Sequence, residues 1–133
     1  MPNEIYKLPI TSSWMDSPKL YQRIGGYCEL ICEYENRENA EITQFNLIFG
    51  RCWAVKFTYY VANDAALIPL TYDKVVDFGE TDWLEKIKRN LAASIGLTVE
   101  LEHLGIYFDD GPLYEFICES FHAEEQIISS DLT

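Results

Sequence analysis

The sequence lacks any long hydrophobic run, and this absence argues against a membrane-spanning helix. Such a helix needs about 18 or more consecutive apolar residues, and no run of that length occurs in the chain of 133 residues. The first twenty residues also lack the continuous apolar block behind a basic start that marks an export signal. We therefore expect a soluble, cytoplasmic protein that does not bind membranes.

Positive charge is scarce, and it is missing from the last third of the chain. There are 22 acidic and 10 basic residues, a formal net charge of −12, and neither lysine nor arginine follows Arg89. The carboxylates beyond that residue are Glu100, Glu102, Asp109, Asp110, Glu115, Glu119, Glu124, Glu125 and Asp131. Because this part of the chain would repel phosphate groups, we expect no nucleic-acid partner. The charge favours a basic protein partner instead.

Motifs that indicate catalysis, nucleotide binding or metal binding are absent as well. The chain contains no GxGxxG, GxxxxGK[ST], GxSxG, HExxH or calcium-loop pattern. The cysteines form no CxxC pair and no zinc-type cluster with histidine; they are Cys28, Cys32, Cys52 and Cys118. We interpret them as buried free thiols of a reducing compartment. The sequence accordingly predicts no cofactor and no bound metal.

What the chain does contain is a large supply of core-forming side chains. Hydrophobic residues make up 48% of it and aromatic residues 14%, which is too apolar for a disordered chain and suits a single domain spanning residues 1–133. Residues 27–34, 44–49 and 53–59 alternate apolar and polar side chains, the pattern of strands with one buried face. Gly50-Arg51 is either a two-residue hairpin turn or a bulge within one long strand.

The clearest helix signal covers about residues 82–94. Thr81 or Asp82 can cap its start, Glu85 follows as in a capping box, and Gly96 ends it. Its apolar stripe consists of Trp83, Leu84, Ile87 and Leu91. The sequence therefore predicts an α+β fold, in which one antiparallel sheet of about five to seven strands packs against this main helix. A β-sandwich with the helix as a connection is the alternative.

The chain is expected to end in a β-hairpin, at about residues 99–121, and a loosely ordered tail, at about residues 123–133. A three-residue loop, Asp109-Asp110-Gly111, places Gly111 in the left-handed conformation and pairs His103 with Ile117. One face of the hairpin is then apolar: Leu104, Ile106, Phe108, Tyr114, Phe116 and Cys118. The opposite face is predicted to be solvated: His103, Gly105, Tyr107, Leu113, Glu115, Ile117 and Glu119. Loops of two or four residues would mix the two faces.

In this register His103 has Glu115 and Glu119 as diagonal neighbours, at about 7 Å. Two carboxylates beside an imidazole can support general acid–base chemistry. His103, Glu115 and Glu119 are therefore the candidate catalytic residues of a small enzyme or ligand-binding domain. A solvated polar patch on a sheet explains the same residues without catalysis, and we favour that interpretation.

The favoured function is a non-enzymatic, acidic protein-interaction domain that presents its carboxylate-rich C-terminal half to a basic partner protein. The predicted binding surface consists of Glu102, Tyr107, Asp109, Asp110, Leu113, Glu115 and Glu119. In size, acidity and lack of a signal peptide the chain resembles bacterial immunity or inhibitor proteins that neutralise basic toxins, a likeness of bulk properties that involves no motif. A homodimer formed through an exposed sheet face or edge is a further expectation.

Overall fold

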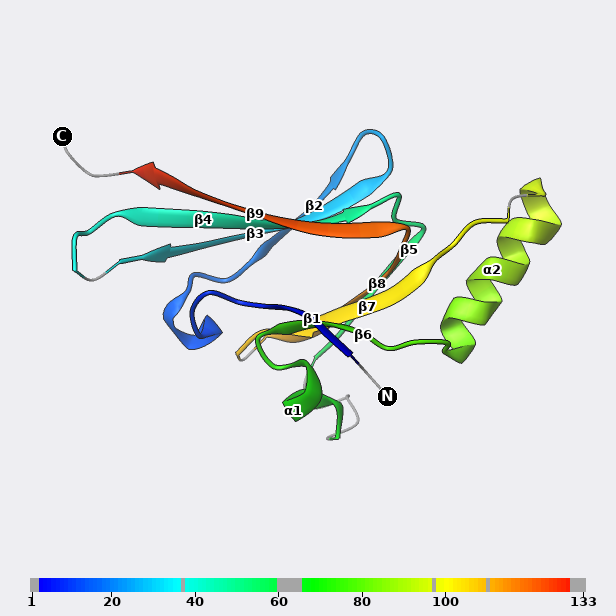
Figure 1. The fold of residues 1–133 in the computed structure, drawn as a ribbon, viewed down its shortest axis with the longest axis horizontal. Coiled ribbons are helices and arrows are strands. Elements are labelled where there is room, and N and C mark those ends of the chain that lie inside the picture. The colour runs from blue at the N-terminus through cyan, green and yellow to red at the C-terminus, as the bar shows by residue number, and fades with distance from the viewer. Residues whose placement is uncertain (1–2, 37, 60–65, 97, 110, 130–133) are drawn as a thin grey trace.

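The computed structural model describes residues 3–36, 38–59, 66–96, 98–109 and 111–129, which form two sheets and one long helix (Figure 1). The strands are β1 (Asn3–Lys7), β2 (Lys19–Arg23), β3 (Tyr27–Glu35), β4 (Ile42–Gly50), β5 (Ala54–Tyr59), β6 (Lys74–Asp77), β7 (Glu102–Tyr107), β8 (Pro112–Cys118) and β9 (Ser120–Ser129). The helices are α1 (Leu67–Thr71), α2 (Asp82–Ile95) and a 3-10 turn, η1 (Ser12–Trp14). In this described part of the chain, no helix has the length and apolar character needed to cross a bilayer.

The strands divide between a five-stranded sheet, in the order β1-β6-β7-β8-β5, and a four-stranded sheet, in the order β2-β3-β4-β9. All the strand pairs in these two sheets are antiparallel. The α+β class and the main helix are confirmed, whereas the prediction of a single sheet of five to seven strands is wrong. Two separate groups of alternating strands exist, and each buries its apolar face by stacking on the other.

The main core lies between the two sheets. It is built from alternate residues of both, among them Leu30, Phe45, Leu47 and Phe49 on one side and Leu104, Ile106 and Phe116 on the other. Phe49 stacks on Phe116 with ring centroids 3.8 Å apart. These are positions that the period of two predicts to be apolar, so local alternation sets which side chains enter the core.

Helix α2 packs on the other face of the five-stranded sheet, at the end where β7 begins (Figure 1). Thr81 is its N-cap, since the Thr81 hydroxyl accepts a hydrogen bond from the Leu84 N–H at 3.3 Å. Gly96 ends the helix with a left-handed φ of 67°. A second core cluster forms beneath the helix from Leu84, Leu101 and Ile117, with Trp83, Ile87 and Leu91 packed against it. The fold is thus a sandwich of two sheets, with the main helix packed on one of them.

The chain crosses from one sheet to the other directly after Gly50. β4 ends at this residue, and β5 begins at Ala54 as the partner of β8 in the five-stranded sheet. Arg51 takes a left-handed φ of 48° within this connection. Neither a hairpin turn nor a bulge in one long strand describes it, because β4 and β5 belong to different sheets.

The end of the chain is a strand where a loosely ordered tail is predicted. β9 pairs with β4 from Gly50 opposite Ser120 to Ile42 opposite Ser129. The prediction is therefore wrong for residues 123–129, because β4 would otherwise leave a long edge unpaired. Residues 130–133 lie outside the described residues.

The turn between β7 and β8 closes differently from the prediction. The Gly111 N–H donates to the Phe108 carbonyl at 3.0 Å and closes the turn. Pro112 has no N–H and could not make the hydrogen bond that usually closes a three-residue loop. The described glycines with positive φ do not include Gly111, and its predicted left-handed conformation is wrong. Asp110 lies outside the described residues.

Candidate functional site

The hairpin of β7 and β8 has the predicted register, with His103 opposite Ile117 and Leu104 opposite Phe116. Its apolar face lies in the main core, as predicted. The opposite face is not solvated, because Phe78 and Trp83 of α2 cover His103, and Tyr72, which follows α1, lies against Tyr107. The exposed fractions are 5% for His103, 6% for Tyr107, 2% for Leu113 and 8% for Glu115. The expectation that these side chains face solvent is wrong.

His103 forms the centre of a hydrogen-bonded cluster. Its Nε2 lies 2.8 Å from Oε1 of Glu115, and its Nδ1 lies 2.7 Å from the hydroxyl of Thr81. The cluster therefore ties the N-terminus of α2 to β7 and β8. Of the two predicted carboxylate neighbours, the structure brings only Glu115 to the imidazole.

The Glu115 carboxylate determines which nitrogen of His103 donates to it. An ionised Glu115 can only accept, so Nε2 carries a hydrogen and donates it. Nδ1 accepts from the Thr81 hydroxyl when the ring is neutral and donates to it when the ring is charged, and in both cases that hydroxyl accepts from the Leu84 N–H. Each polar group in this series has a partner of the right kind, which is the condition for burying it at low cost.

Aromatic rings and one cation enclose the cluster. The ring of Phe78 lies 4.7 Å from that of His103, and the edge of Trp83 meets it at 5.1 Å. The ammonium of Lys56 lies 3.9 Å from Oε2 of Glu115 and 4.4 Å from the centre of the Trp83 ring. A substrate could therefore reach His103 only after Phe78 or Trp83 had moved.

The other predicted site residues are scattered. Glu119 accepts from the Arg51 guanidinium at 3.3 Å and from the Trp53 indole at 3.4 Å. Glu102 is half-buried, and burial together with neighbouring Asp77 raises the pKa of its carboxyl group.

Asp109 lies at the other end of the hairpin, is exposed, and accepts from the Tyr72 hydroxyl at 2.8 Å. Glu102 and Glu119 lie at the opposite end, beside Cys118. The buried Tyr107, Leu113 and Glu115 lie between these two ends, and Asp110 falls outside the described residues. The predicted binding residues consequently do not form one continuous acidic surface.

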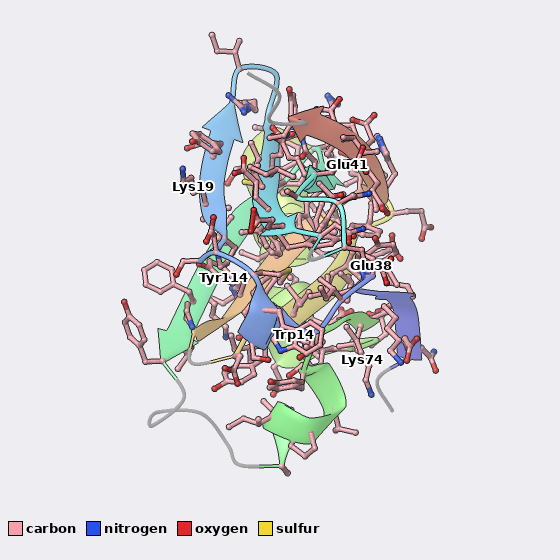
Figure 2. All side chains as sticks on the ribbon, turned by 90° about the vertical axis from the view of Figure 1, so that its left-hand side faces the viewer. Trp14, Lys19, Glu38, Glu41, Lys74 and Tyr114 are labelled. Carbon is pink, nitrogen blue, oxygen red and sulfur yellow. The ribbon has the colours of Figure 1, made fainter. Side chains whose placement is uncertain are left out.

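A different acidic region exists at the far end of the sandwich, around Trp14. Figure 2 shows Trp14 on the side of the molecule that faces the viewer, with Glu38 nearby. One groove, of about 320 Å³, is lined by Ile10, Trp14, Tyr34, Glu35, Asn36 and Glu38. A second, of about 420 Å³, is lined by Trp14, Asp16, Glu33, Tyr34, Glu35 and Ile42. Because the two share three lining residues, we treat them as one feature, the Trp14 groove.

The Trp14 groove arises where an N-terminal loop meets β3. The Asp16 N–H donates to the Glu33 carbonyl at 3.1 Å and holds the loop against the strand. Trp14 is 57% exposed, and every charged residue among the described lining residues is acidic. The carboxylates of Glu33, Glu35 and Glu38 are close together in the sequence. The contact between the loop and β3 is what brings Asp16 and Trp14 next to them.

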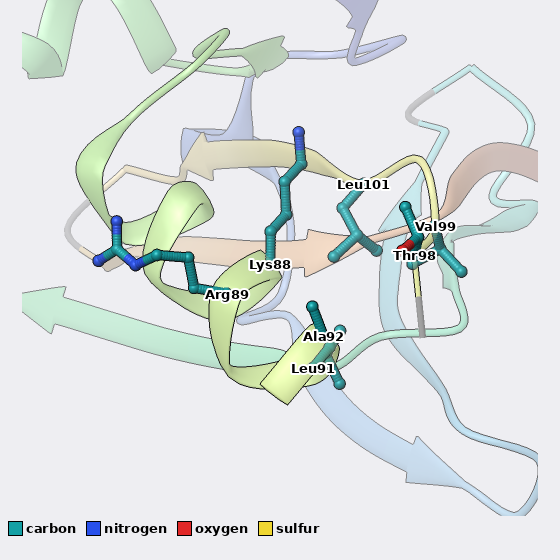
Figure 3. Close-up of a pocket in the computed structure, with 7 residues that line it drawn as sticks. All are labelled: Lys88, Arg89, Leu91, Ala92, Thr98, Val99 and Leu101. Carbon is teal, nitrogen blue, oxygen red and sulfur yellow. The ribbon is translucent and has the colours of Figure 1, made fainter. Parts of the chain in front are cut away.

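A third groove, of about 230 Å³, lies between α2 and the segment that leads into β7 (Figure 3). It is lined by Lys88, Arg89, Leu91, Ala92, Thr98, Val99 and Leu101. Leu91, Val99 and Leu101 belong to the second core cluster. This groove is therefore the margin of that core.

The chain has no counterpart in the comparisons with known proteins: no protein-family model, curated protein sequence or solved structure matches it.

Proposed function

We propose that the protein is a non-enzymatic interaction domain that binds a basic partner protein through the Trp14 groove. The observation that carries this proposal is an indole, 57% exposed, among the carboxylates of Asp16, Glu33, Glu35 and Glu38. An arginine or lysine side chain can lie on an indole ring and pair with carboxylates at the same time. The groove therefore offers both kinds of contact that a basic side chain uses.

The charge of the whole chain supports the same partner. A net charge of −12 attracts a basic protein over a distance and speeds association. The carboxylate-rich C-terminal half contributes through β9, where Glu124 and Glu125 line a polar groove beside Asn46. The likeness in bulk properties to immunity and inhibitor proteins makes a basic toxin the first class of natural partner to test.

A hexa-arginine peptide is the simplest probe of the Trp14 groove. We expect calorimetric titration to give an affinity that weakens as salt is raised, since exposed charges are screened. Trp14→Ala should weaken binding about tenfold, the loss typical of an aromatic contact at the centre of an interface. The double variant Glu33→Gln/Glu35→Gln should also reduce the dependence on salt.

The matched control is Glu100→Gln, which removes one exposed charge from the segment between α2 and β7, outside the residues that line the Trp14 groove. It should change the affinity by less than twofold. The proposal would be contradicted if Trp14→Ala bound hexa-arginine with the affinity of the wild type, or if the wild-type affinity did not change with salt concentration.

A small enzyme or ligand-binding domain centred on His103 is the second candidate, and one observation favours it. Thr81, His103 and Glu115 stand in the order of a hydroxyl–imidazole–carboxylate relay. This candidate requires Phe78 or Trp83 to swing away, and Glu119 has no part in it. If wild-type protein hydrolyses p-nitrophenyl acetate no faster than His103→Gln, the candidate is rejected.

We also propose that two copies of the chain form a homodimer through β5, an edge strand of the five-stranded sheet. Val55, Phe57 and Tyr59 are exposed on it, and apolar edge strands favour pairing with another chain. Light scattering should then give twice the monomer mass at high concentration, and Phe57→Lys should restore the monomer. A monomer at every concentration contradicts this proposal.

A further inference from the structure

Two of the four cysteines lie together in a groove between the edge strands β2 and β5. This groove, of about 310 Å³, is lined by Leu20, Gln22, Cys28, Cys52, Trp53, Ala54 and Val55. Cys28 is 5% exposed and Cys52 is half-buried. Cys32 and Cys118 are fully buried in the main core. Cys28 and Cys52 therefore form a pair that lines a groove, the groove pair, whereas Cys32 and Cys118 are enclosed in the core.

The backbone holds the groove pair in place from two sides. Cys28 stands opposite Phe49 in the pairing of β3 with β4. The Cys52 N–H donates to the Gly26 carbonyl at 2.6 Å, two residues before Cys28 along the chain. Both side chains line the same groove, where the Cys52 thiol donates to the Ala54 carbonyl at 3.4 Å. Both cysteines are thus held near each other by elements that do not depend on a sulfur–sulfur bond.

We propose that Cys28 and Cys52 form a thiol–disulfide exchange site, which a low-molecular-weight disulfide of the glutathione class oxidises to an intramolecular disulfide. This goes beyond the proposed interaction with a basic partner and does not depend on it. The Trp14 groove and the cysteine groove have no lining residue in common.

The chemistry of the pair is asymmetric. The neighbouring Cys52 side chain lowers the pKa of Cys28, whereas neighbouring Cys28 and burial raise the pKa of Cys52. Cys28 is therefore the better first nucleophile, because the thiolate is the attacking form. Burial raises the pKa of both Cys32 and Cys118 to about 12, which keeps these thiols protonated and unreactive.

The exchange proceeds in two balanced steps. The Cys28 thiolate attacks one sulfur of the small disulfide, the sulfur–sulfur bond breaks, and one small thiol leaves after taking up a proton. Cys52 then gives its proton to water and attacks Cys28 Sγ, which releases the second small thiol. Two protein thiols are oxidised by two electrons in total, and one small disulfide is reduced to two thiols.

The test uses the full chain equilibrated with oxidised glutathione, then blocked with iodoacetamide in denaturant. We expect two of the four thiols to escape alkylation, and peptide mapping to join Cys28 to Cys52. The thermal midpoint should rise after oxidation, because the bond closes a loop around β3 and β4. Reduction with dithiothreitol should return both the thiol count and the midpoint to their starting values.

Single substitutions separate the members of the pair. Cys52→Ser should stop at a mixed disulfide between glutathione and Cys28, whereas Cys32→Ser should still form the internal bond. Four alkylated thiols in the wild type after equilibration, or a bond that includes Cys32 or Cys118, would overturn the proposal. The wild-type thiol count decides the matter even where a variant fails to fold.

Discussion

The His103 cluster and the Trp14 groove place similar side chains in opposite settings. Each combines carboxylate with aromatic side chains, but His103 and Glu115 are at most 8% exposed, whereas Trp14 is 57% exposed. In the cluster, both imidazole nitrogens and Oε1 of Glu115 have hydrogen-bond partners inside the protein. In the groove, the carboxylates and the indole border a space that a ligand can enter.

This difference teaches that residue type alone does not identify a functional site. An imidazole between a hydroxyl and a carboxylate has the composition of a catalytic relay, yet the same bonds also satisfy a helix cap and join it to a sheet. Buried polar groups with complete partners stabilise the fold, whereas charged groups that face an open groove remain available to a ligand. Predictions that alter one region and leave the other intact test this division.

The largest expected effect is on stability, for His103→Ala. The substitution removes a packed ring, and it leaves both the buried Glu115 carboxylate and the Thr81 hydroxyl short of a partner. We expect a loss of about 3 kcal/mol in the free energy of unfolding, measured with urea. Trp14→Ala is the matched control and should lose less than about 0.5 kcal/mol, because its side chain is largely exposed. If both variants lost the same free energy of unfolding, the His103 cluster would be no more important for stability than the Trp14 groove.

A smaller loss is expected when the helix cap is removed. Thr81→Ala abolishes the bond to the Leu84 N–H and the bond to His103 together. The expected loss is about 1 to 2 kcal/mol, somewhat more than that of an isolated cap residue. Thr81→Ser keeps the hydroxyl and should stay close to the wild type in the same urea titration. A Thr81→Ser variant as unstable as Thr81→Ala would mean that the hydroxyl is not what matters.

The smallest effect is a gain in stability from Glu102→Gln, and it depends on pH. Burial raises the pKa of Glu102 above its ordinary value, and the nearby Asp77 carboxylate raises it further. The folded protein thus favours the neutral carboxyl group, whose stabilising effect is complete below the unfolded pKa, near 4.3. That effect is lost as the pH rises through the raised folded pKa. The thermal midpoint of Glu102→Gln should therefore be higher than that of the wild type at pH 7, and the two midpoints should be equal near pH 4. A variant with a lower midpoint than the wild type at pH 7 would contradict this prediction.

Local chemistry made part of this fold predictable. The alternation of β3, β4, β7 and β8 fixed which side chains enter the main core, and the face-matching argument placed His103 opposite Ile117. The cap at Thr81 and the end of α2 at Gly96 followed from residue types alone. These features depend on neighbours a few residues away or on a single hairpin.

Contacts between distant segments were not predictable in the same way. The hairpin face with His103 and Glu115 looked solvated because nothing in its own sequence shows that Phe78 and Trp83 cover His103. Residues 123–129 looked like part of a loosely ordered tail because their partner, β4, lies far back in the chain. The Trp14 groove was missed for the same reason, since it depends on the bond from Asp16 to Glu33.

The three tryptophans provide the most direct test of the proposed function. The indole N–H signals of Trp14, Trp53 and Trp83 can be followed together by NMR while hexa-arginine is added to labelled protein. We predict that the Trp14 signal moves in proportion to the peptide bound. The signal of Trp83, whose ring packs against that of His103, should stay in place. A Trp14 signal that does not move, or a shift confined to Trp83, would contradict the proposed function.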